Sequence, residues 1–177
     1  MFKCLKIIVC CDKHNGIGKE NTLPWNIPSE MKQFKDKTIG NGFNCVIMGK
    51  NTFLSIPKNH RPLCKRHSVV VTQDETLKAE YGHNPNITFL SCPNDVITFV
   101  QMTVYDDYWL IGGKMMYEYF LQHYLKYLSE IHLSILPQDY DCDTFLNLDK
   151  YITSFEFVNE TKHKLFDCKR FKNKDCL

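Results

Sequence analysis

Glu30 is the first candidate for chemistry, because it is a carboxylate at the start of an expected helix with apolar neighbours. Pro28 is typical of the first helical position, so Glu30 falls in the first turn, where the helix dipole favours a negative charge. Met31 and Phe34 continue at helical spacing. A carboxylate accepts two hydrogen bonds and titrates, so it can orient paired donors or support a proton transfer. For an isolated Glu, however, a charge in solvent is the default interpretation.

Two further segments have a composition suited to binding a nucleotide. Lys50, Asn51 and Thr52 open a helix directly after an apolar strand, where exposed N–H groups bind phosphate and a Lys adds charge. Gly112 and Gly113 end another strand, and their lack of side chains lets the backbone approach a dinucleotide closely. A glycine pair also makes a plain turn leading into a helix, so that alternative stays open.

The elements that must position these residues alternate between strands and helices. Continuous apolar runs predict strands at residues 7–11, 45–48, 68–72, 87–90, 109–111 and 130–135. Helices are predicted from Pro28, over residues 51–54, from Pro93 and over about residues 114–127. Such alternation indicates a largely parallel α/β sheet. Two strands within residues 154–171, around a turn near residues 159–161, indicate an antiparallel edge.

In such sheets ligands bind at the carboxyl ends of the strands, so the loops at Gly16, Gly49 and Gly112 are where a site is expected.

Composition favours one globular domain, which we expect to span residues 1–177. The chain is 44% hydrophobic, and 22 Lys and Arg against 20 Asp and Glu leave a net charge of +2, too small to predict nucleic-acid binding. No apolar run is long enough for an export signal or a membrane span, so we expect a cytoplasmic protein. The nine cysteines are then expected to be reduced, and no Cys-x-x-Cys spacing predicts a metal site.

Residues 23–30, which read LPWNIPSE, resemble the dihydrofolate reductase family, whose first helix follows Leu-Pro-Trp and carries the only ionisable side chain at the pterin site. Other segments are similar to the family in the same order, at residues 15–18, 46–53, 56–66, 111–117 and 143–145. Their ordered combination is a specific signal. It implies a dihydrofolate reductase-like three-layer sandwich: a central, mostly parallel sheet with an antiparallel C-terminal hairpin, and helices on both faces.

The resemblance also implies an activity, the NADPH-dependent reduction of 7,8-dihydrofolate to 5,6,7,8-tetrahydrofolate. This is an oxidoreductase step on a CH–NH group that serves one-carbon metabolism and thymidylate synthesis. The implied cofactor is NADPH, and the implied ligands are dihydrofolate and antifolates such as methotrexate. We expect a monomer that requires no metal, nucleic acid or membrane.

By this resemblance the catalytic residues are Glu30, Trp25 and Leu23. Glu30 would orient the pterin and support its protonation through water, Trp25 would hold that water, and Leu23 lies at the end of the mobile loop. The implied substrate-binding residues are Ile8, Val9, Glu30, Met31, Phe34, Ile56, Leu63, Arg66, Ile111 and Ser134. The implied cofactor-binding residues are Cys10, Ile17, Gly18, Gly49, Lys50, Asn51, Thr52, Thr72, Gln73, Gly112, Gly113, Lys114, Met115 and Tyr117.

Individual residues of these sets carry specific expectations. Arg66 suits the α-carboxylate of the glutamate tail of folate, because its fork binds a carboxylate bidentately. Ser134 stands where relatives carry a Thr that reaches the pterin amino group. Gly112 and Gly113 are expected to share a cis peptide bond. Gln73 and Cys92 stand where relatives often carry Arg for the ribose 2′-phosphate, so the preference for the phosphorylated cofactor rests on Lys50.

Three alternatives remain. A pyrimidine reductase of the same fold should lack both Leu-Pro-Trp with the carboxylate helix and a need for Arg66. A folate-binding relative without catalysis would bind antifolates but show no turnover. The chain is also compatible with one part of a fusion, since some relatives are joined to thymidylate synthase.

Overall fold

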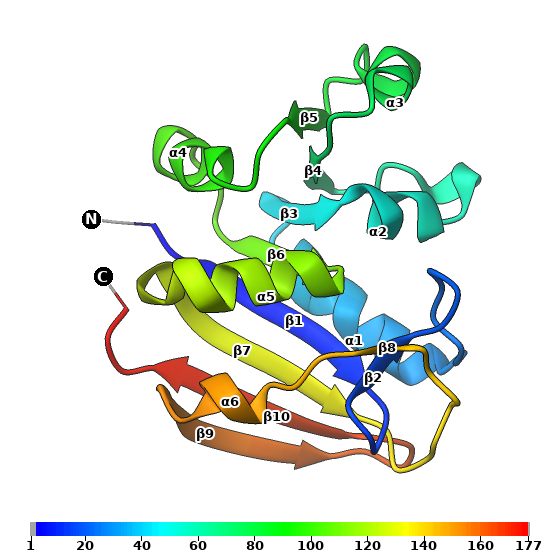
Figure 1. The fold of residues 1–177 in the computed structure, drawn as a ribbon, viewed down its shortest axis with the longest axis vertical. Helices are drawn as coiled ribbons and strands as arrows, with labels where there is room; N and C mark the ends of the chain where they lie inside the picture. The colour runs from blue at the N-terminus through cyan, green and yellow to red at the C-terminus, as the bar shows by residue number, and fades with distance from the viewer. Residues whose placement is uncertain (1–2, 177) are drawn as a thin grey trace.

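The computed structural model describes residues 3–176, whose centre is an eight-stranded sheet with helices on both faces (Figure 1). Residues 1, 2 and 177 of the expected domain lie outside the described residues. The strands are β1 (Leu5–Cys11), β2 (Gly16–Gly18), β3 (Asn44–Gly49), β4 (Arg66–Val71), β5 (Ile87–Leu90), β6 (Tyr108–Gly112), β7 (Leu128–Ile135), β8 (Thr144–Phe145), β9 (Phe155–Lys162) and β10 (Asp167–Asn173). The helices are α1 (Pro28–Ile39), α2 (Lys50–Ser55), α3 (Glu75–Tyr81), α4 (Asp95–Met102), α5 (Lys114–His123) and α6 (Asp149–Ile152), with 3-10 turns at Lys58–His60 and Leu125–Tyr127.

The strand order across the sheet is β5-β4-β3-β6-β1-β7-β10-β9, and β2 and β8 form a separate two-stranded sheet. All pairings from β5 to β7 are parallel, whereas β10 runs antiparallel to both β7 and β9. The expected mostly parallel sheet with an antiparallel C-terminal hairpin is therefore confirmed. Its parallel strands are continuous apolar runs because helices cover both faces, so that neighbours such as Val46 and Ile47 are both fully buried.

Alternate residues of β1 face opposite sides of the sheet. Leu5, Ile7 and Val9 belong to the apolar cluster that includes residues of α4 and α5. Ile8 belongs to the cluster on the other face, where α2 and α3 contribute buried residues and Phe34 of α1 packs against them. This alternation decides which residues of β1 can reach Glu30 on α1.

The helix expected over residues 114–127 is shorter than predicted. It ends at His123, because Tyr124 leaves helical geometry with φ −130° and ψ 31°, and a 3-10 turn follows. Asp74 caps α3, which the sequence analysis did not predict, by accepting a hydrogen bond from the Leu77 N–H at 3.0 Å.

The predicted position of the C-terminal hairpin turn was wrong. The chain reverses at residues 163–166, where the His163 N–H donates to the Phe166 carbonyl at 2.9 Å. The polar residues 159–161, taken for a turn, lie inside β9. This strand is the exposed edge of the sheet, and an edge strand accommodates polar side chains on both faces.

Over residues 3–176, no helix combines the length and the apolar character needed to cross a membrane.

Candidate functional site

Glu30 is buried, although it lies on the first turn of a helix. Ile27 occupies the N-cap position, Pro28 begins α1, and the Glu30 N–H donates to the Ile27 carbonyl at 3.0 Å. Only 5% of Glu30 is exposed. The default interpretation of a charge in solvent is therefore wrong for this residue.

Three neighbouring strands present a row of small polar side chains to Glu30. Cys10 on β1 pairs with Ser134 on β7, and Ser134 pairs in turn with Cys168 on β10. Residues in register on adjacent strands point to the same face, so all three lie beneath α1. The Ser134 hydroxyl and the Cys10 thiol donate hydrogen bonds to the Glu30 carboxylate. The inexact match of Ser134 to the Thr of relatives thus keeps a hydroxyl at this place.

The electrostatic environment of Glu30 favours its neutral form. Burial raises the pKa of the carboxyl, and this effect outweighs the hydrogen bonds from Ser134 and Cys10 and the charge of Lys37, which act in the opposite direction. Within residues 3–176 no cation lies within ion-pair distance of this carboxylate. A buried carboxyl with two neutral donors and no counterion therefore keeps its proton to a higher pH than an ordinary Glu does.

Two residues next to Glu30 and Ser134 were missed by the sequence analysis, Cys168 in this row and Gln33 on α1. The Cys168 sulfur lies 3.6 Å from the Ser134 hydroxyl, and it accepts a hydrogen bond from the Gln33 amide at 2.7 Å. Gln33 follows Glu30 by three residues and therefore shares its helix face, which is a signal that was present in the sequence. Cys168 offered none, because its place depends on the register of the C-terminal hairpin.

Most of the predicted apolar wall comes together beside this row. Ile8 is buried in one cluster, against which four partly buried members of the predicted set pack: Phe34, Ile56, Leu63 and Ile111. Val9 does not join them, because it faces the opposite side of the sheet with the α5 residues. Met31 is 44% exposed.

Trp25 lies in the segment that leads into α1 and is buried against Tyr140, with ring centroids 5.3 Å apart. The indole N–H of Trp25 has no hydrogen-bond partner among the described residues. A buried donor of this kind suits an ordered water or a ligand atom. Leu23, two residues earlier, is 50% exposed and makes no part of the core.

A third residue missed by the sequence analysis, Asp12, holds the loop between β1 and β2. Its carboxylate accepts hydrogen bonds from the backbone N–H groups of His14 at 2.9 Å, Gly16 at 2.8 Å and Tyr140 at 3.3 Å. Asp12 precedes an Asn-Gly turn, a position where Asp side chains commonly bond the following backbone, so this signal was available.

The backbone of the glycine pair, Gly112 and Gly113, is closely packed against neighbouring side chains. Gly112 and Gly113 share a cis peptide bond, as the resemblance implied, and Gly112 has φ +124°. A Cβ atom at Gly112 would lie 3.2 Å from the Thr52 hydroxyl, and one at Gly113 would lie 3.3 Å from it. Tyr117 closes the same corner, where its buried hydroxyl donates to the Ile8 carbonyl at 2.8 Å. The structure thus brings together four of the predicted cofactor residues and one residue of the apolar wall.

A polar group gathers at the ends of β3 and β4. The Lys50 ammonium lies 3.4 Å from the Asp74 carboxylate, and the Asp74 N–H donates to the Thr72 hydroxyl at 3.1 Å. Gln73, between them in the chain, is exposed. The Asn51 side-chain amide donates to the Asn21 side-chain oxygen at 3.3 Å, which joins the start of α2 to the loop before Leu23.

The remaining predicted cofactor residues border these groups to differing degrees. Ile17 and Gly18 lie in β2, and Gly49 ends β3. Lys114 begins α5 and its ammonium lies 3.8 Å from the Glu118 carboxylate. Met115 is 84% exposed and contributes nothing to the core.

Arg66 is a buried cation that has hydrogen bonds but no counterion. Its Nη1 donates to the Thr38 hydroxyl at 2.8 Å, and its Nε donates to the Cys64 carbonyl at 3.0 Å. No carboxylate within residues 3–176 forms an ion pair with it, and burial lowers its pKa. A guanidinium remains charged in proteins, so this position is suited to binding an anion. Arg66 lines a pocket together with residues 42–44, 62–65, 67, 84–86 and 105.

Among the described residues, no group of three or more His, Cys, Asp or Glu side chains is arranged to hold a metal ion.

The sequence of this chain is similar to known proteins over most of its length. The family model described as dihydrofolate reductase matches residues 4–174. The chain is 32% identical over 170 residues to a viral dihydrofolate reductase of Saimiriine herpesvirus 2, covering 89% of this chain and 76% of that protein.

Longer relatives match as well. Over 149 residues the chain is 30% identical to bifunctional dihydrofolate reductase-thymidylate synthase 2 of Arabidopsis thaliana, covering 80% of this chain and 26% of the relative. Over 162 residues it is 30% identical to a protein named segregation and condensation protein A of Mycoplasma pneumoniae, covering 92% and 29%. The chain therefore spans less than a third of the length of these two relatives.

Proposed function

Because the chain belongs to the dihydrofolate reductase family, we propose that it reduces 7,8-dihydrofolate to 5,6,7,8-tetrahydrofolate with NADPH as the hydride donor. The observation that carries the proposal is Glu30, a buried carboxyl with neutral donors and no counterion beside an apolar wall. The reaction belongs to the oxidoreductases that act on CH–NH groups. Its product would supply one-carbon metabolism and thymidylate synthesis.

Glu30 is suited to fixing the orientation of a pterin. The ring presents a 2-amino group beside a ring nitrogen, and a carboxylate offers two acceptors at a matching separation. Cys10 and Ser134 hold the carboxylate from below, so its direction is set before a ligand arrives. Ile8, Phe34 and Ile111 supply apolar surface on which the flat ring can lie.

Glu30 and Trp25 together suit the delivery of a proton to the reduced ring. A carboxyl of raised pKa retains a proton closer to neutral pH than an ordinary Glu does, which supports polarisation of the ring. The unpartnered indole N–H of Trp25 is available to hold a water molecule. Leu23 is exposed on the adjoining loop, and we assign it to the closure of that loop over the site.

Arg66 is assigned to the glutamate tail of folate. Its guanidinium is buried and lacks a carboxylate partner within the described chain, so an incoming carboxylate would neutralise it. Leu63 and Ile56 lie in the apolar cluster that continues toward Glu30. A ligand with a planar head and an anionic tail would therefore contact both ends of this wall.

The residues at the glycine pair fit a dinucleotide. Gly112 and Gly113 pack so closely against the Thr52 hydroxyl that a Cβ at either position would be crowded, which holds the end of β6 against the start of α2. When bound, NADPH supplies the hydride. Lys50 and the N-terminus of α2 would meet its phosphates, and Tyr117 would keep the glycine pair in place through the Ile8 carbonyl.

Preference for the 2′-phosphate would rest on Lys50 and Thr72. Gln73 brings no charge. Lys50 is the cation among the residues assigned to this phosphate, and the Asp74 carboxylate, 3.4 Å away, partly neutralises its charge. We therefore propose NADPH as the cofactor with a smaller preference over NADH than an additional Arg would give.

We further propose that residues 1–177 act as one monomeric domain in the cytoplasm, without a need for nucleic acid or a membrane, and that antifolates such as methotrexate bind at Glu30. The sequence patterns support these assignments, as do the small net charge of +2 and the family membership.

The test is to follow the loss of near-ultraviolet absorbance of NADPH when purified protein is mixed with dihydrofolate, with and without methotrexate. Folate-dependent oxidation that methotrexate stops is the expected result. Tight methotrexate binding without turnover would instead indicate a folate-binding relative. If neither turnover nor methotrexate binding is observed, the substrate assignment is wrong, and a pyrimidine reductase activity becomes the next one to assay.

A further inference from the structure

The two ends of the described chain meet through a pair of cysteines. Cys4 immediately precedes β1, and Cys176 follows the end of β10 at Asn173. Their sulfur atoms are in contact, with the Cys176 thiol donating to the Cys4 sulfur at 2.6 Å. In Figure 1 the start of β1 and the segment after β10 lie at the same end of the sheet.

Cys4 is held in place from both sides. Before it, the Lys3 N–H donates to the Gln101 side-chain oxygen at 3.2 Å, and the Gln101 amide donates back to the Lys3 carbonyl at 2.8 Å. After it, Leu5 pairs with Tyr108 on one side and Leu128 on the other. The backbone at Cys4 therefore has little freedom to carry the thiol away.

Cys176 is anchored at the same place in the sheet. The Asn173 amide donates to the carbonyls of Leu125 at 2.8 Å and Leu128 at 2.7 Å, and the Asp175 N–H donates to the Asn173 side-chain oxygen at 3.0 Å. Leu128 is also the strand partner of Leu5. Both cysteines are thus adjacent to segments fixed on one residue of β7, which keeps their sulfurs together while the fold is intact.

Several other cysteines are shielded from thiol chemistry. Burial raises the pKa of Cys11 to about 12 and, together with the nearby charge of Asp12, raises that of Cys142 to about 11. Burial also raises the pKa of Cys10 and Cys45. Because the thiolate is the reactive form, these four exchange slowly near neutral pH.

We propose that Cys4 and Cys176 form a reversible disulfide that joins the two ends of the chain, made and broken by exchange with low-molecular-weight thiols. The thiolate of one cysteine attacks a sulfur of glutathione disulfide, forming a mixed disulfide and releasing one glutathione thiolate. The second cysteine, as its thiolate, then attacks the protein sulfur of the mixed disulfide and releases the other glutathione. Two protein thiols are oxidised, one glutathione disulfide is reduced to two thiols, and the two protons pass to the glutathione products.

The bond would close almost the whole chain into a loop, and it would do so without moving the folded structure. Closing a loop of this length removes a large part of the conformational freedom of the unfolded chain. The oxidised form should therefore melt at a temperature about 5–10 °C above that of the reduced form. It would also lock the start of β1, the strand that carries Ile8 and Cys10, to the segment after β10.

The test uses the full chain equilibrated with reduced or oxidised glutathione at pH 8, then alkylated and digested without reduction. The expected result is a peptide pair linked through Cys4 and Cys176 in the oxidised sample, together with the higher melting temperature. In Cys4→Ser and Cys176→Ser the difference between oxidised and reduced melting temperatures should vanish, whatever each substitution does to stability by itself.

Cys64→Ser is the matched control, because Cys64 is exposed and any mixed disulfide it forms would leave the chain ends unchanged. This variant should keep the full difference in melting temperature. The proposal is overturned if the linked pair is absent after equilibration with glutathione disulfide, or if Cys4→Ser retains the difference. Neither readout depends on enzymatic turnover, so the result stands apart from the proposed function.

Discussion

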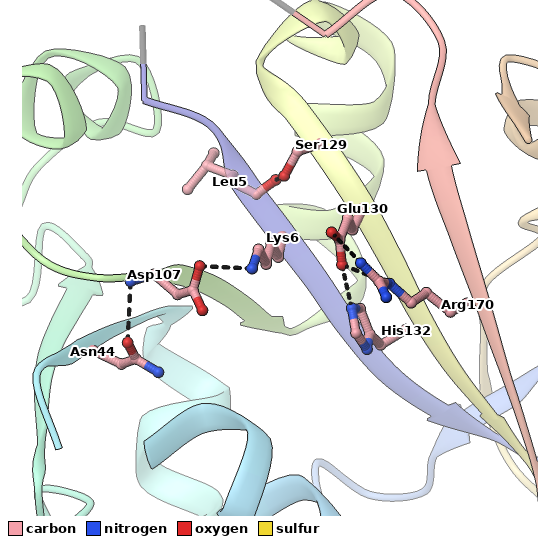
Figure 2. Close-up of polar contacts among 8 residues, drawn as sticks. All are labelled: Leu5, Lys6, Asn44, Asp107, Ser129, Glu130, His132 and Arg170. Atoms are coloured by element: carbon pink, nitrogen blue, oxygen red, sulfur yellow. Dashed lines mark hydrogen bonds and ion pairs between the residues drawn. The ribbon is translucent and has the colours of Figure 1, made fainter. Parts of the chain in front are cut away.

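Two carboxylates lie against the same pair of strands, β1 and β7, and their pKa values are shifted in opposite directions: Glu30 on α1 is buried, and Glu130 on β7 is partly buried. Glu130 pairs with Lys6 in the strand register, at the start of the pair, whereas Glu30 lies over Cys10 and Ser134, near its end. Figure 2 shows Glu130 beside His132 and Arg170. Its carboxylate accepts two hydrogen bonds from the Arg170 guanidinium, at 2.7 and 3.0 Å, and lies 2.7 Å from His132 Nε2.

The pKa values of the two groups move in opposite directions. The His132 hydrogen bond and the Arg170 ion pair lower the pKa of Glu130 to about 2, against the effect of burial. Burial also lowers the pKa of His132, so the imidazole is neutral at pH 7 and donates from Nε2, and Arg170 is the charged partner. Burial raises the pKa of Glu30, because only neutral donors and the distant charge of Lys37 oppose it.

The difference separates a structural carboxylate from one suited to chemistry. A buried carboxylate with a bidentate Arg is fixed in its ionised form and cannot exchange a proton near neutral pH. A buried carboxyl without a counterion costs stability, yet it can bind a cationic ring or supply a proton. Glu30 on α1 and Glu130 on β7 therefore differ both in their partners and in burial, because burial dominates at Glu30 and the hydrogen bonds from His132 and Arg170 dominate at Glu130.

The largest predicted effect comes from removing the ionisation of Glu30. Glu30→Gln keeps the shape of the side chain, and we expect kcat to fall by about 10²–10³-fold near neutral pH, because the pterin loses its charge-assisted pair and its source of protons. Steady-state kinetics with dihydrofolate and NADPH measures this. Wild-type rates in the variant would remove Glu30 from the mechanism.

The same variant should be at least as stable as the wild type at pH 7. A carboxyl whose folded pKa is raised contributes its stability below the unfolded value of 4.5, and this contribution is lost as the pH rises through the folded pKa. Thermal melts between pH 4 and 8 should therefore show that the melting temperature of Glu30→Gln rises relative to that of the wild type as the pH increases. If the stability of Glu30→Gln relative to the wild type instead falls between pH 4 and pH 7, the raised pKa of Glu30 is contradicted.

Arg66 extends the comparison to a buried cation that has neutral hydrogen-bond partners but no carboxylate partner within residues 3–176. Arg66→Leu should weaken the binding of dihydrofolate by about 30- to 1000-fold, because the tail carboxylate loses a buried bidentate partner. A pterin without the glutamate tail is the matched ligand control, and its affinity should change little. Equal losses for both ligands in equilibrium titrations would mean that Arg66 acts on the fold and not on the tail.

For Glu130 the expected loss is in stability. Glu130→Gln should cost about 2 kcal/mol in the free energy of unfolding, since it leaves Arg170 without its carboxylate, while kcat/KM stays within about threefold. Glu160→Gln is the matched control: Glu160 forms a partly exposed pair with Lys169 at 3.7 Å, and its loss should cost less than about 0.5 kcal/mol. Urea unfolding of both variants tests the contrast, which fails if the two losses are equal.

The loss at Glu130 should also depend on pH in a defined window. A lowered folded pKa contributes stability above the unfolded value of 4.5, and this is lost as the pH falls toward about 2. The difference in the free energy of unfolding between the wild type and Glu130→Gln should therefore be smaller at pH 3 than at pH 7. An unchanged gap between them would show that packing, and not charge, accounts for the difference.

The smallest predicted effect concerns Cys10, which donates to Glu30. Cys10→Ala removes a hydrogen bond that lowers the pKa of Glu30, so the acid limb of the kcat/KM profile should move to higher pH with little change in its maximum. Cys10→Ser, which restores a donor, should return the limb toward the wild type. A fall in the maximum with no movement of the limb would indicate a packing role instead.

The sequence was sufficient for much of this arrangement, but not for all of it. Glu30, Gly112 and Arg66 were found because they lie in short local motifs whose order matches the family. Local periodicity also predicted the parallel sheet. It failed at residues 159–161, where an exposed edge strand has the polar composition of a turn.

What the sequence could not provide is the register between distant strands. Cys168 reaches Ser134 only through the pairing of β10 with β7, and Arg170 reaches Glu130 through the same pairing. Val9 was assigned to the apolar wall by the family resemblance, yet alternation along the strand turns it to the other face. The contact between Cys4 and Cys176 likewise depends on the completed sheet.

The most direct test of the contrast is a pH titration followed by carbon-13 NMR of side-chain carboxyl groups in protein labelled at glutamate, with Glu30→Gln and Glu130→Gln to assign the two signals. The account predicts that Glu30 titrates above the ordinary value of 4.5 and that Glu130 stays ionised until the pH approaches about 2. A Glu30 signal that titrates at or below that of Glu130 would contradict the account.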